Sequence, residues 1–163
     1  GAKIRLTPPW PRRDVSELFR TRAGWNPLSE HDPERFEQDL LERILPALDT
    51  ERPVFLLDFP EYEASLSRRK GDGSGRAERV ELFAGGLELA NGFSELTDAG
   101  EQRRRFLFAN QLRERRGGKP YPLPEAFLSC LDRMPPSAGM ALGVDRLVML
   151  FSNAARIDDV VEV

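Results

Sequence analysis

Residues 77–98 read AERVELFAGGLELANGFSELTD and hold two alternating runs of apolar and polar residues around a Gly-Gly pair. Alternation with a period of two is typical of β-strands with one buried face. Gly85 and Gly86 supply the positive φ angles that a two-residue hairpin turn requires. The stretch therefore predicts an antiparallel hairpin, with one strand over 77–84 and the other over 87–93.

Three carboxylates, Glu81, Glu88 and Glu95, recur here at intervals of seven residues. Seven is odd, so Glu81 and Glu88 would lie on opposite faces of one continuous strand. Across a hairpin they can approach to about 5 Å between Cβ atoms if they are directly opposite. Two carboxylates this close repel unless a cation lies between them. Hard oxygen ligands favour Mg²⁺ or Mn²⁺, and Mg²⁺ is usually shared with phosphate oxygens, so the pair predicts a nucleotide site.

In a second interpretation, these carboxylates lie on the solvent-exposed face of an amphipathic strand. Glu81 alternates with apolar residues, Glu88 lies between two leucines, and Glu95 lies between Ser94 and Leu96. Asn91-Gly92 is also a common turn signal. Residue types and spacing leave both interpretations open.

The segment 139–147 reads GMALGVDRL and has the pattern of a glycine-rich buried strand that leads into a helix. We expect the strand over 140–144 and the helix over 145–153. Glycines let a flat group approach the backbone, and arginine stacks on aromatic rings or binds phosphate bidentately. For Arg146, the pattern is equally consistent with an exposed surface residue. The inward face of this helix is expected to hold Leu147, Leu150 and Phe151.

The rest of the chain predicts an α+β protein, because hairpin strands and separate helices do not alternate as in a parallel sheet. Asp14 is expected to cap the first helix, with Glu17 completing a capping box, and Asp98 to cap the longest one. Residues 7–13 are expected to form an extended lead-in to the first helix. A buried strand is expected over 54–59. The helices are expected over 15–22, 34–45, 99–115 and 125–134.

The amino-acid composition argues against several classes of function and site. The net charge of −3 gives no broad basic field for nucleic acid. A local run of arginines (Arg103, Arg104, Arg105, Arg113, Arg115 and Arg116) fits a solvated helix face better than a binding patch. One cysteine and one histidine exclude a His/Cys zinc site. No apolar run approaches the ~20 residues of a membrane helix, and the single cysteine suits a reducing, cytoplasmic setting.

Together, residues 81–98 and 139–147 resemble the C-terminal part of the catalytic core of class II lysyl-tRNA synthetases. The second segment resembles motif 3 of that class, and Ala-Asn-Gly-Phe at 90–93 resembles a stretch of the lysine subgroup. Within the lysine subgroup, the chain is most similar to stand-alone paralogues that lack an anticodon-binding domain and ligate (R)-β-lysine to elongation factor P. Ala141 stands where the synthetases usually have glycine, and 55–66 resembles the short link of these paralogues.

The resemblance implies a class II antiparallel sheet flanked by helices, and an enzyme that uses ATP and Mg²⁺. Lysine or β-lysine would be activated as an adenylate and transferred to a lysine of elongation factor P. Arg146 and Glu88 would be the catalytic residues, and Glu81 and Glu88 would hold the metal. The residues implied for ATP binding are Glu81, Glu88, Leu89, Gly143 and Arg146. The residues implied for lysine binding are Asn91, Glu95 and Ala141.

The resemblance begins after motifs 1 and 2 of the class, and residues 1–50 match the region that connects motif 2 to motif 3. We therefore expect residues 1–163 to form one partial catalytic domain with half an active site, which is inactive alone. The parent protein is expected to be a homodimer. Two alternatives remain: the core of a lysyl-tRNA synthetase, with tRNA the less favoured acceptor, and a non-catalytic ligand-binding relative.

Overall fold

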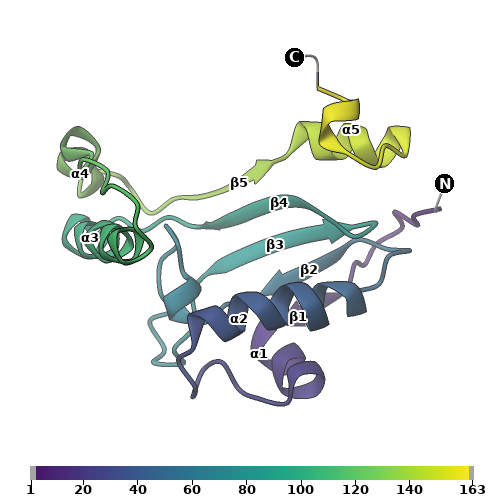
Figure 1. Cartoon of the computed structure of the whole chain (residues 1–163), viewed down its shortest axis with the longest axis horizontal. Helices are drawn as coiled ribbons and strands as arrows, with labels where there is room; N and C mark the ends of the chain where they lie inside the picture. The colour runs from purple at the N-terminus through teal and green to yellow at the C-terminus, as the bar shows by residue number, and fades with distance from the viewer. Residues whose placement is uncertain (1–2, 162–163) are drawn as a thin grey trace.

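The computed structural model describes residues 3–161, which form a five-stranded mixed sheet with helices around it (Figure 1). The strands follow one another in chain order across the sheet, and only the β1–β2 pair is parallel. The predicted α+β class is confirmed, although the sheet is not purely antiparallel, because the proline-rich lead-in ends in the short β1. The strands are β1 (Arg12–Asp14), β2 (Val54–Leu57), β3 (Arg79–Ala84), β4 (Leu87–Ser94) and β5 (Ala138–Leu142).

The helices begin where the sequence predicts, and two of them change type along their length. The Asp14 carboxylate accepts the Glu17 N–H at 2.9 Å, and the Asp98 carboxylate accepts the Glu101 N–H at 2.8 Å, so both predicted N-caps are confirmed. Within residues 3–161, no bond from the Glu17 side chain back to Asp14 completes the predicted capping box. The first two helices continue as π-helical turns. The helical elements are α1 (Val15–Leu18), η1 (Phe19–Ala23), α2 (Pro33–Asp39), η2 (Leu40–Ile44), η3 (Leu45–Ala47), η4 (Glu61–Glu63), α3 (Ala99–Arg115), α4 (Glu125–Leu131), α5 (Val144–Ser152) and η5 (Ile157–Asp159).

The predicted hairpin is confirmed as β3 and β4, joined by Gly85 and Gly86 with φ angles of 59° and 81°. One detail was not predicted. The register shifts between Leu82 and Phe83, so β4 holds one extra residue opposite β3. Glu81 therefore lies opposite Asn91, and Glu88 lies opposite Phe83. The expectation that the two glutamates could lie directly opposite each other is wrong. The bulge nevertheless puts both on one face, because residues paired across strands share a face.

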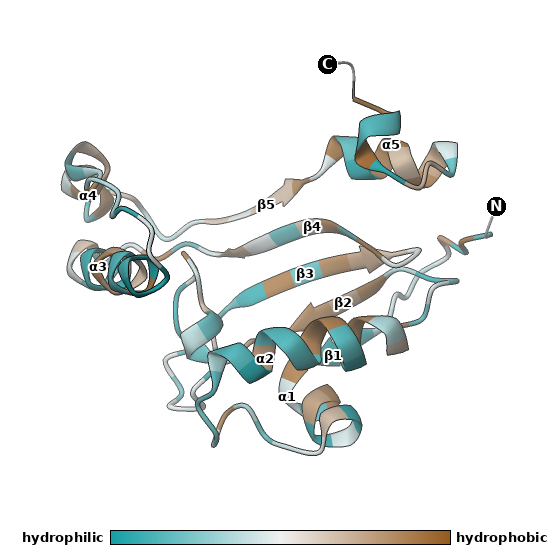
Figure 2. Cartoon of the chain, viewed as in Figure 1, coloured by the Kyte–Doolittle hydropathy of each residue, from teal (hydrophilic) through white to brown (hydrophobic). Residues whose placement is uncertain are grey.

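A hydrophobic core fills the space between the N-terminal helices and one face of β2 and β3. Phe19 stacks on Phe36 with ring centroids 4.5 Å apart and meets Trp25 edge-on. These rings pack with Leu56 and Phe83 from the sheet. In Figure 2, β2 is hydrophobic along its length and the outer side of α2 is hydrophilic. The helices cover this face over β2 and β3 and leave the β4–β5 side of it uncovered (Figure 1).

Several predicted boundaries and one predicted core residue are wrong. The second strand ends at Leu57, because Asp58 has a left-handed φ of 62°. The last predicted strand, β5, starts and ends two residues early, and α4 stops at Leu131. Phe151, expected to face inward on α5, is 77% exposed. Its neighbour Leu150 lies against the hairpin turn at Gly85, which leaves Phe151 on the outside of the helix.

Gly92 is a steric requirement of the β4–β5 pairing, and its replacement tests that pairing. A Cβ at Gly92 would lie 2.7 Å from the Gly139 carbonyl oxygen and 2.9 Å from the Met140 Cβ. We expect Gly92→Ala to lower the free energy of unfolding by about 2 kcal/mol, as overpacking does. Urea unfolding measures it. Gly71→Ala is the matched control, since nothing lies within 4 Å there. Equal stabilities of the two variants would contradict the register.

Candidate active site

The β4–β5 side of one sheet face gathers most of the predicted site residues. Glu81 pairs with Asn91, Glu88 with Phe83, and Asn91 pairs in turn with Ala141 on β5. Residues paired across neighbouring strands point to the same face. The core residues Leu56 and Phe83 lie on this face as well. The site residues therefore border the hydrophobic core without being covered by it.

Glu81 is the most buried carboxylate of the group, with 5% of its surface exposed. Its Oε1 accepts hydrogen bonds from the Arg79 guanidinium and, at 3.2 Å, from Asn91 Nδ2. The interpretation of Glu81 as a solvent-facing residue is wrong. Burial raises the pKa of Glu81, Arg79 lowers it, and the negative charge of Glu88 raises it again. The two glutamates therefore influence each other electrostatically, as a shared cation site requires.

Arg146 reaches from α5 back to the hairpin, where it meets Glu88. Its Nη1 donates to the Glu88 carbonyl oxygen at 2.9 Å and to Glu88 Oε2 at 3.2 Å. The side chains of Arg146 and Glu88 are 47% and 34% exposed. An ion pair this accessible to water contributes about 0–1 kcal/mol, so both groups can exchange partners at low cost.

The remaining predicted residues are positioned by backbone contacts around the same strands. The Gly143 N–H donates to the Leu89 carbonyl oxygen at 2.8 Å, and the Leu89 side chain is buried. The Glu95 N–H donates to the Ser137 carbonyl oxygen at 2.9 Å, and Glu95 Oε1 lies over Gly139. Asn91 Oδ1 is enclosed and accepts no hydrogen bond from any residue of 3–161. The structure thus joins Glu81 to Asn91 and Glu88 to Arg146, whereas no hydrogen bond or ion pair within residues 3–161 joins Glu95 to either pair.

Two residues of this region were not anticipated from the sequence. Arg79 donates a hydrogen bond to Glu81. Glu63, on the short η4 turn, lies near enough to Arg79 and Glu81 for their charges to shift its pKa. The period of two on β3 could have indicated Arg79, which precedes Glu81 by two residues and shares its face. For Glu63 the sequence offers no such signal. Its position depends on how η4 folds onto the sheet.

Comparison with known proteins identifies the family of this chain. Residues 2–162 match the family model of class II tRNA synthetases (D, K and N). The chain belongs to this family. Among its relatives is the elongation factor P--(R)-beta-lysine ligase of Edwardsiella ictaluri, 47% identical over 91% of this chain and 47% of the relative. The protein of the same name from Haemophilus ducreyi is 41% identical over 88% of this chain and 50% of the relative. The lysine--tRNA ligase of Anaeromyxobacter dehalogenans strain 2CP-C is 45% identical over 99% of this chain and 38% of the relative.

The relatives differ in how many positions their matches span. The chain spans about half the length, or less, of the relatives described above. The match to the lysine--tRNA ligase runs over 196 positions, more than the 163 residues of this chain, so that relative carries additional residues inside the matched region. The match to the E. ictaluri ligase runs over 154 positions. The match to the H. ducreyi ligase runs over 164 positions for 88% of this chain, so that relative carries additional residues as well.

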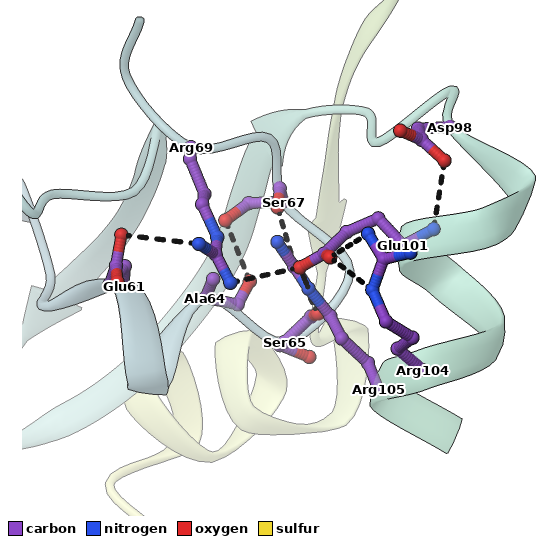
Figure 3. Close-up of polar contacts among 9 residues, drawn as sticks. All are labelled: Glu61, Ala64, Ser65, Ser67, Arg69, Asp98, Glu101, Arg104 and Arg105. Carbon is purple, nitrogen blue, oxygen red and sulfur yellow. Dashed lines mark hydrogen bonds and ion pairs between the residues drawn. The ribbon is translucent and has the colours of Figure 1, made fainter. Parts of the chain in front are cut away.

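The arginine run of this synthetase-family chain is engaged within the molecule. Arg104 and Arg105 both bind the Glu101 carboxylate, and Arg69 binds it from the other side (Figure 3). Arg105 also donates to the Ser65 and Ser67 carbonyl oxygens at 2.8 Å. The network ties α3 to the segment that follows η4. The expectation of a solvated face is wrong for Arg105, whose side chain is 17% exposed.

Two absences bear on the site. In the described residues 3–161, no cluster of three or more His, Cys, Asp and Glu side chains has the geometry of a metal site. A metal ion here would therefore take most of its ligands from a substrate and from water. Over the same residues, no helix combines the length and hydropathy that a bilayer-spanning segment needs.

Glu63 makes stability depend on pH. Burial raises its pKa to about 7, with Arg79 opposing and Glu37 and Glu81 adding to the rise. When a carboxyl group binds its proton more tightly in the folded state than in the unfolded state, the fold loses stability as the pH rises between the two pKa values, here from about 4.5 to about 7. Allowing for partial solvent screening, we expect Glu63→Gln to be more stable than wild type by about 1–2 kcal/mol at pH 8 and equal to it near pH 4.

Urea unfolding of both proteins at the two pH values measures this difference. Glu61→Gln is the matched control, because Glu61 belongs to the same turn and its side chain is 45% exposed. If Glu63→Gln were no more stable than wild type at pH 8, ionising Glu63 in the fold would cost little free energy, and the prediction would be wrong.

Proposed function

We propose that the natural protein activates lysine or (R)-β-lysine with ATP and transfers the acyl group to a lysine side chain of elongation factor P. The observation that carries the proposal is the grouping of Glu81, Glu88 and Asn91 on one face, with Arg146 reaching Glu88. The names of the relatives from E. ictaluri and H. ducreyi support the amino acid and the acceptor.

Glu81 and Glu88 would hold Mg²⁺, and their chemistry fits the ion. Both recorded bonds to Glu81 fall on Oε1, and Oε2 accepts none within residues 3–161. Two carboxylates with the remaining positions left to phosphate and water is the usual arrangement for Mg²⁺. When bound, the ion would neutralise phosphate charge and orient the triphosphate.

Arg146 would exchange the Glu88 carboxylate for the nucleotide. The exposed pair is inexpensive to open. Released from Glu88, the guanidinium would stack on adenine and contact the γ-phosphate. Gly143, whose N–H is held by the Leu89 carbonyl, would keep the backbone beside Arg146 close to the nucleotide.

Asn91, Glu95 and Ala141 would receive the amino acid. An enclosed acceptor without a donor, such as Asn91 Oδ1, costs about 1–3 kcal/mol and is a natural partner for a substrate ammonium. Glu95 would supply a negative charge for the second ammonium of the same substrate. Ala141 lies directly opposite Asn91, so its methyl group would border the bound amino acid. The resemblance to the β-lysine ligases, which Ala141 shares, supports a preference for β-lysine.

The reaction that these residues serve has two steps. The amino-acid carboxylate attacks the α-phosphorus of ATP, forming a carboxyl–phosphate bond and releasing pyrophosphate. A lysine amine of the acceptor then attacks the acyl carbon, forming an amide and releasing AMP. No side chain of this chain acts as a nucleophile. Its residues align reactants and stabilise charge.

We further propose that this chain supplies only part of the active site. β5 is an edge strand within residues 3–161, and its Met140 and Leu142 side chains are 49% and 51% exposed. Such an edge is suited to pairing with a strand from elsewhere in the protein. The motif 2 arginine and the dimer interface of the family would also come from outside this chain.

A lysyl-tRNA ligase is the second candidate, supported by the A. dehalogenans relative. Two observations favour the elongation factor. The match to the lysine--tRNA ligase runs over 196 positions, against 154 and 164 for the two elongation factor P ligases. Most of the arginine run on α3 is bound to its own chain: Arg103 to Glu125, Arg104 and Arg105 to Glu101, and Arg113 to the Lys119 carbonyl.

Acyl transfer by the natural full-length protein distinguishes these candidates. After incubation with ATP, Mg²⁺ and (R)-β-lysine, we expect mass spectrometry to find the acyl group on elongation factor P and no charging of lysine tRNA. Charged tRNA with unmodified elongation factor P would reverse the assignment. Pyrophosphate exchange by the isolated 163-residue chain would refute the partial site, and a full-length protein that takes up no ATP would support a non-catalytic relative.

A further inference from the structure

Arg79 is anchored more firmly than any other charged group of the site. Its Nη1 donates to the Glu63 carbonyl oxygen at 2.7 Å, its Nη2 donates to Glu81, and its Cζ lies 4.5 Å above the Phe59 ring. Phe59 is itself 1% exposed. A side chain held at three points has little rotational freedom left, so the position of its guanidinium is fixed by η4, the core and β3 together.

This anchoring determines how the Glu81 carboxylate is presented. Arg79 and Asn91 both donate to Oε1. Oε2 accepts no hydrogen bond from residues 3–161. One oxygen is therefore used for orientation, and the other keeps its lone pairs for an incoming ligand.

Arg79 also supplies the positive charge that lets two acidic groups remain close. Glu81 and Glu88 repel each other, and only Arg79 and Arg146 are paired with them within residues 3–161. Arg146 is half exposed and can leave, whereas the Arg79 side chain is 16% exposed and is enclosed by its three contacts. Arginine suits this role because its planar fork reaches a carbonyl and a carboxylate at once, which a single ammonium does not.

We propose that Arg79 is a positioning residue of the reaction, which fixes the Glu81 carboxylate so that Oε2 faces the metal–nucleotide complex. The inference rests on the proposed function, since it assumes that Glu81 and Glu88 receive the metal. A purely structural role is the rival explanation, because the Glu63 contact also attaches η4 to the sheet.

Binding of Mn²⁺ separates the two roles without measuring turnover. In the natural full-length protein with ATP, the loss of the free Mn²⁺ signal in electron paramagnetic resonance, relative to a sample with the same ATP and no protein, gives the affinity of the site for the metal. We expect Arg79→Lys to weaken Mn²⁺ binding roughly tenfold, because one charge-assisted, oriented hydrogen bond is lost. Arg79→Gln, which also loses the charge, should weaken it further. Arg68→Lys is the matched control, since Arg68 forms an ion pair with Glu78, outside the site.

Each outcome has a distinct meaning. Unchanged Mn²⁺ affinity in both Arg79 variants, with a lowered unfolding temperature, overturns the inference and assigns Arg79 to the fold. Loss of folding in both variants overturns it in the same way. A wild-type protein that shows no ATP-dependent Mn²⁺ binding overturns the proposed function together with this inference.

Discussion

Replacing Arg146 by alanine is expected to lower kcat/KM for ATP-dependent amino-acid activation by two to three orders of magnitude. Removing one preorganised group that meets developing charge typically costs this much, or about 3–4 kcal/mol of transition-state stabilisation. The free energy of unfolding should change by less than about 1 kcal/mol, because the ion pair that Arg146 forms with Glu88 is well exposed. Pyrophosphate exchange in the natural full-length protein measures the activity, and urea unfolding measures the stability.

Arg146→Lys sharpens this test. Lysine keeps the charge and loses the flat guanidinium that stacks on an adenine. We expect it to recover less than a tenth of the lost activity. Full recovery would show that Arg146 acts only as a point charge. An Arg146→Ala protein as active as wild type would remove this residue from the site.

Glu88→Gln is expected to lower kcat/KM about a hundredfold and to raise the Mg²⁺ concentration needed for half-maximal activity. The amide has nearly the same shape, and the Glu88 carbonyl oxygen still accepts its bond from Arg146. The change therefore removes one negative charge and one ligand oxygen without disturbing the hairpin. Because the Glu88 side chain is partly exposed, stability should stay within about 1 kcal/mol of wild type.

A magnesium titration of pyrophosphate exchange checks this expectation. Glu78→Gln is a suitable control, since Glu78 is a glutamate paired with Arg68, away from the site. If Glu88→Gln required no more Mg²⁺ than Glu78→Gln, Glu88 would not be a metal ligand, and Glu81 would have to act alone.

The hairpin and the helix caps were predictable because their signals are local. Two consecutive glycines with positive φ and alternating residues on both sides leave few alternatives to a tight turn. Asp14 and Asp98 cap helices through bonds to residues three positions away. The extra residue in β4 was not predictable, because no local pattern distinguishes a bulge at Leu89 from a regular strand. This single residue decides which side chains lie opposite Glu81 and Glu88.

Only the part of the candidate site that lies on the predicted strands, or directly after them, could be predicted from the sequence. Asn91 and Ala141 come together because β4 and β5 pair, and Arg146 follows from the helix after β5. Arg79 and Glu63 were missed, since their roles depend on η4 lying against the sheet, a contact between distant segments. Phe151 was misplaced for a similar reason: only the packing of Leu150 at the hairpin turn shows which side of α5 faces outward.

The most direct test of this account is a crystal structure of the natural full-length protein with Mg²⁺, a non-hydrolysable ATP analogue and (R)-β-lysine. We expect the metal about 2.1 Å from carboxylate oxygens of Glu81 and Glu88, Arg146 against the adenine, and the amino acid beside Asn91 and Glu95. A nucleotide on the opposite face of the sheet, or one bound while Arg146 stays on Glu88 and no metal contacts either glutamate, would contradict it.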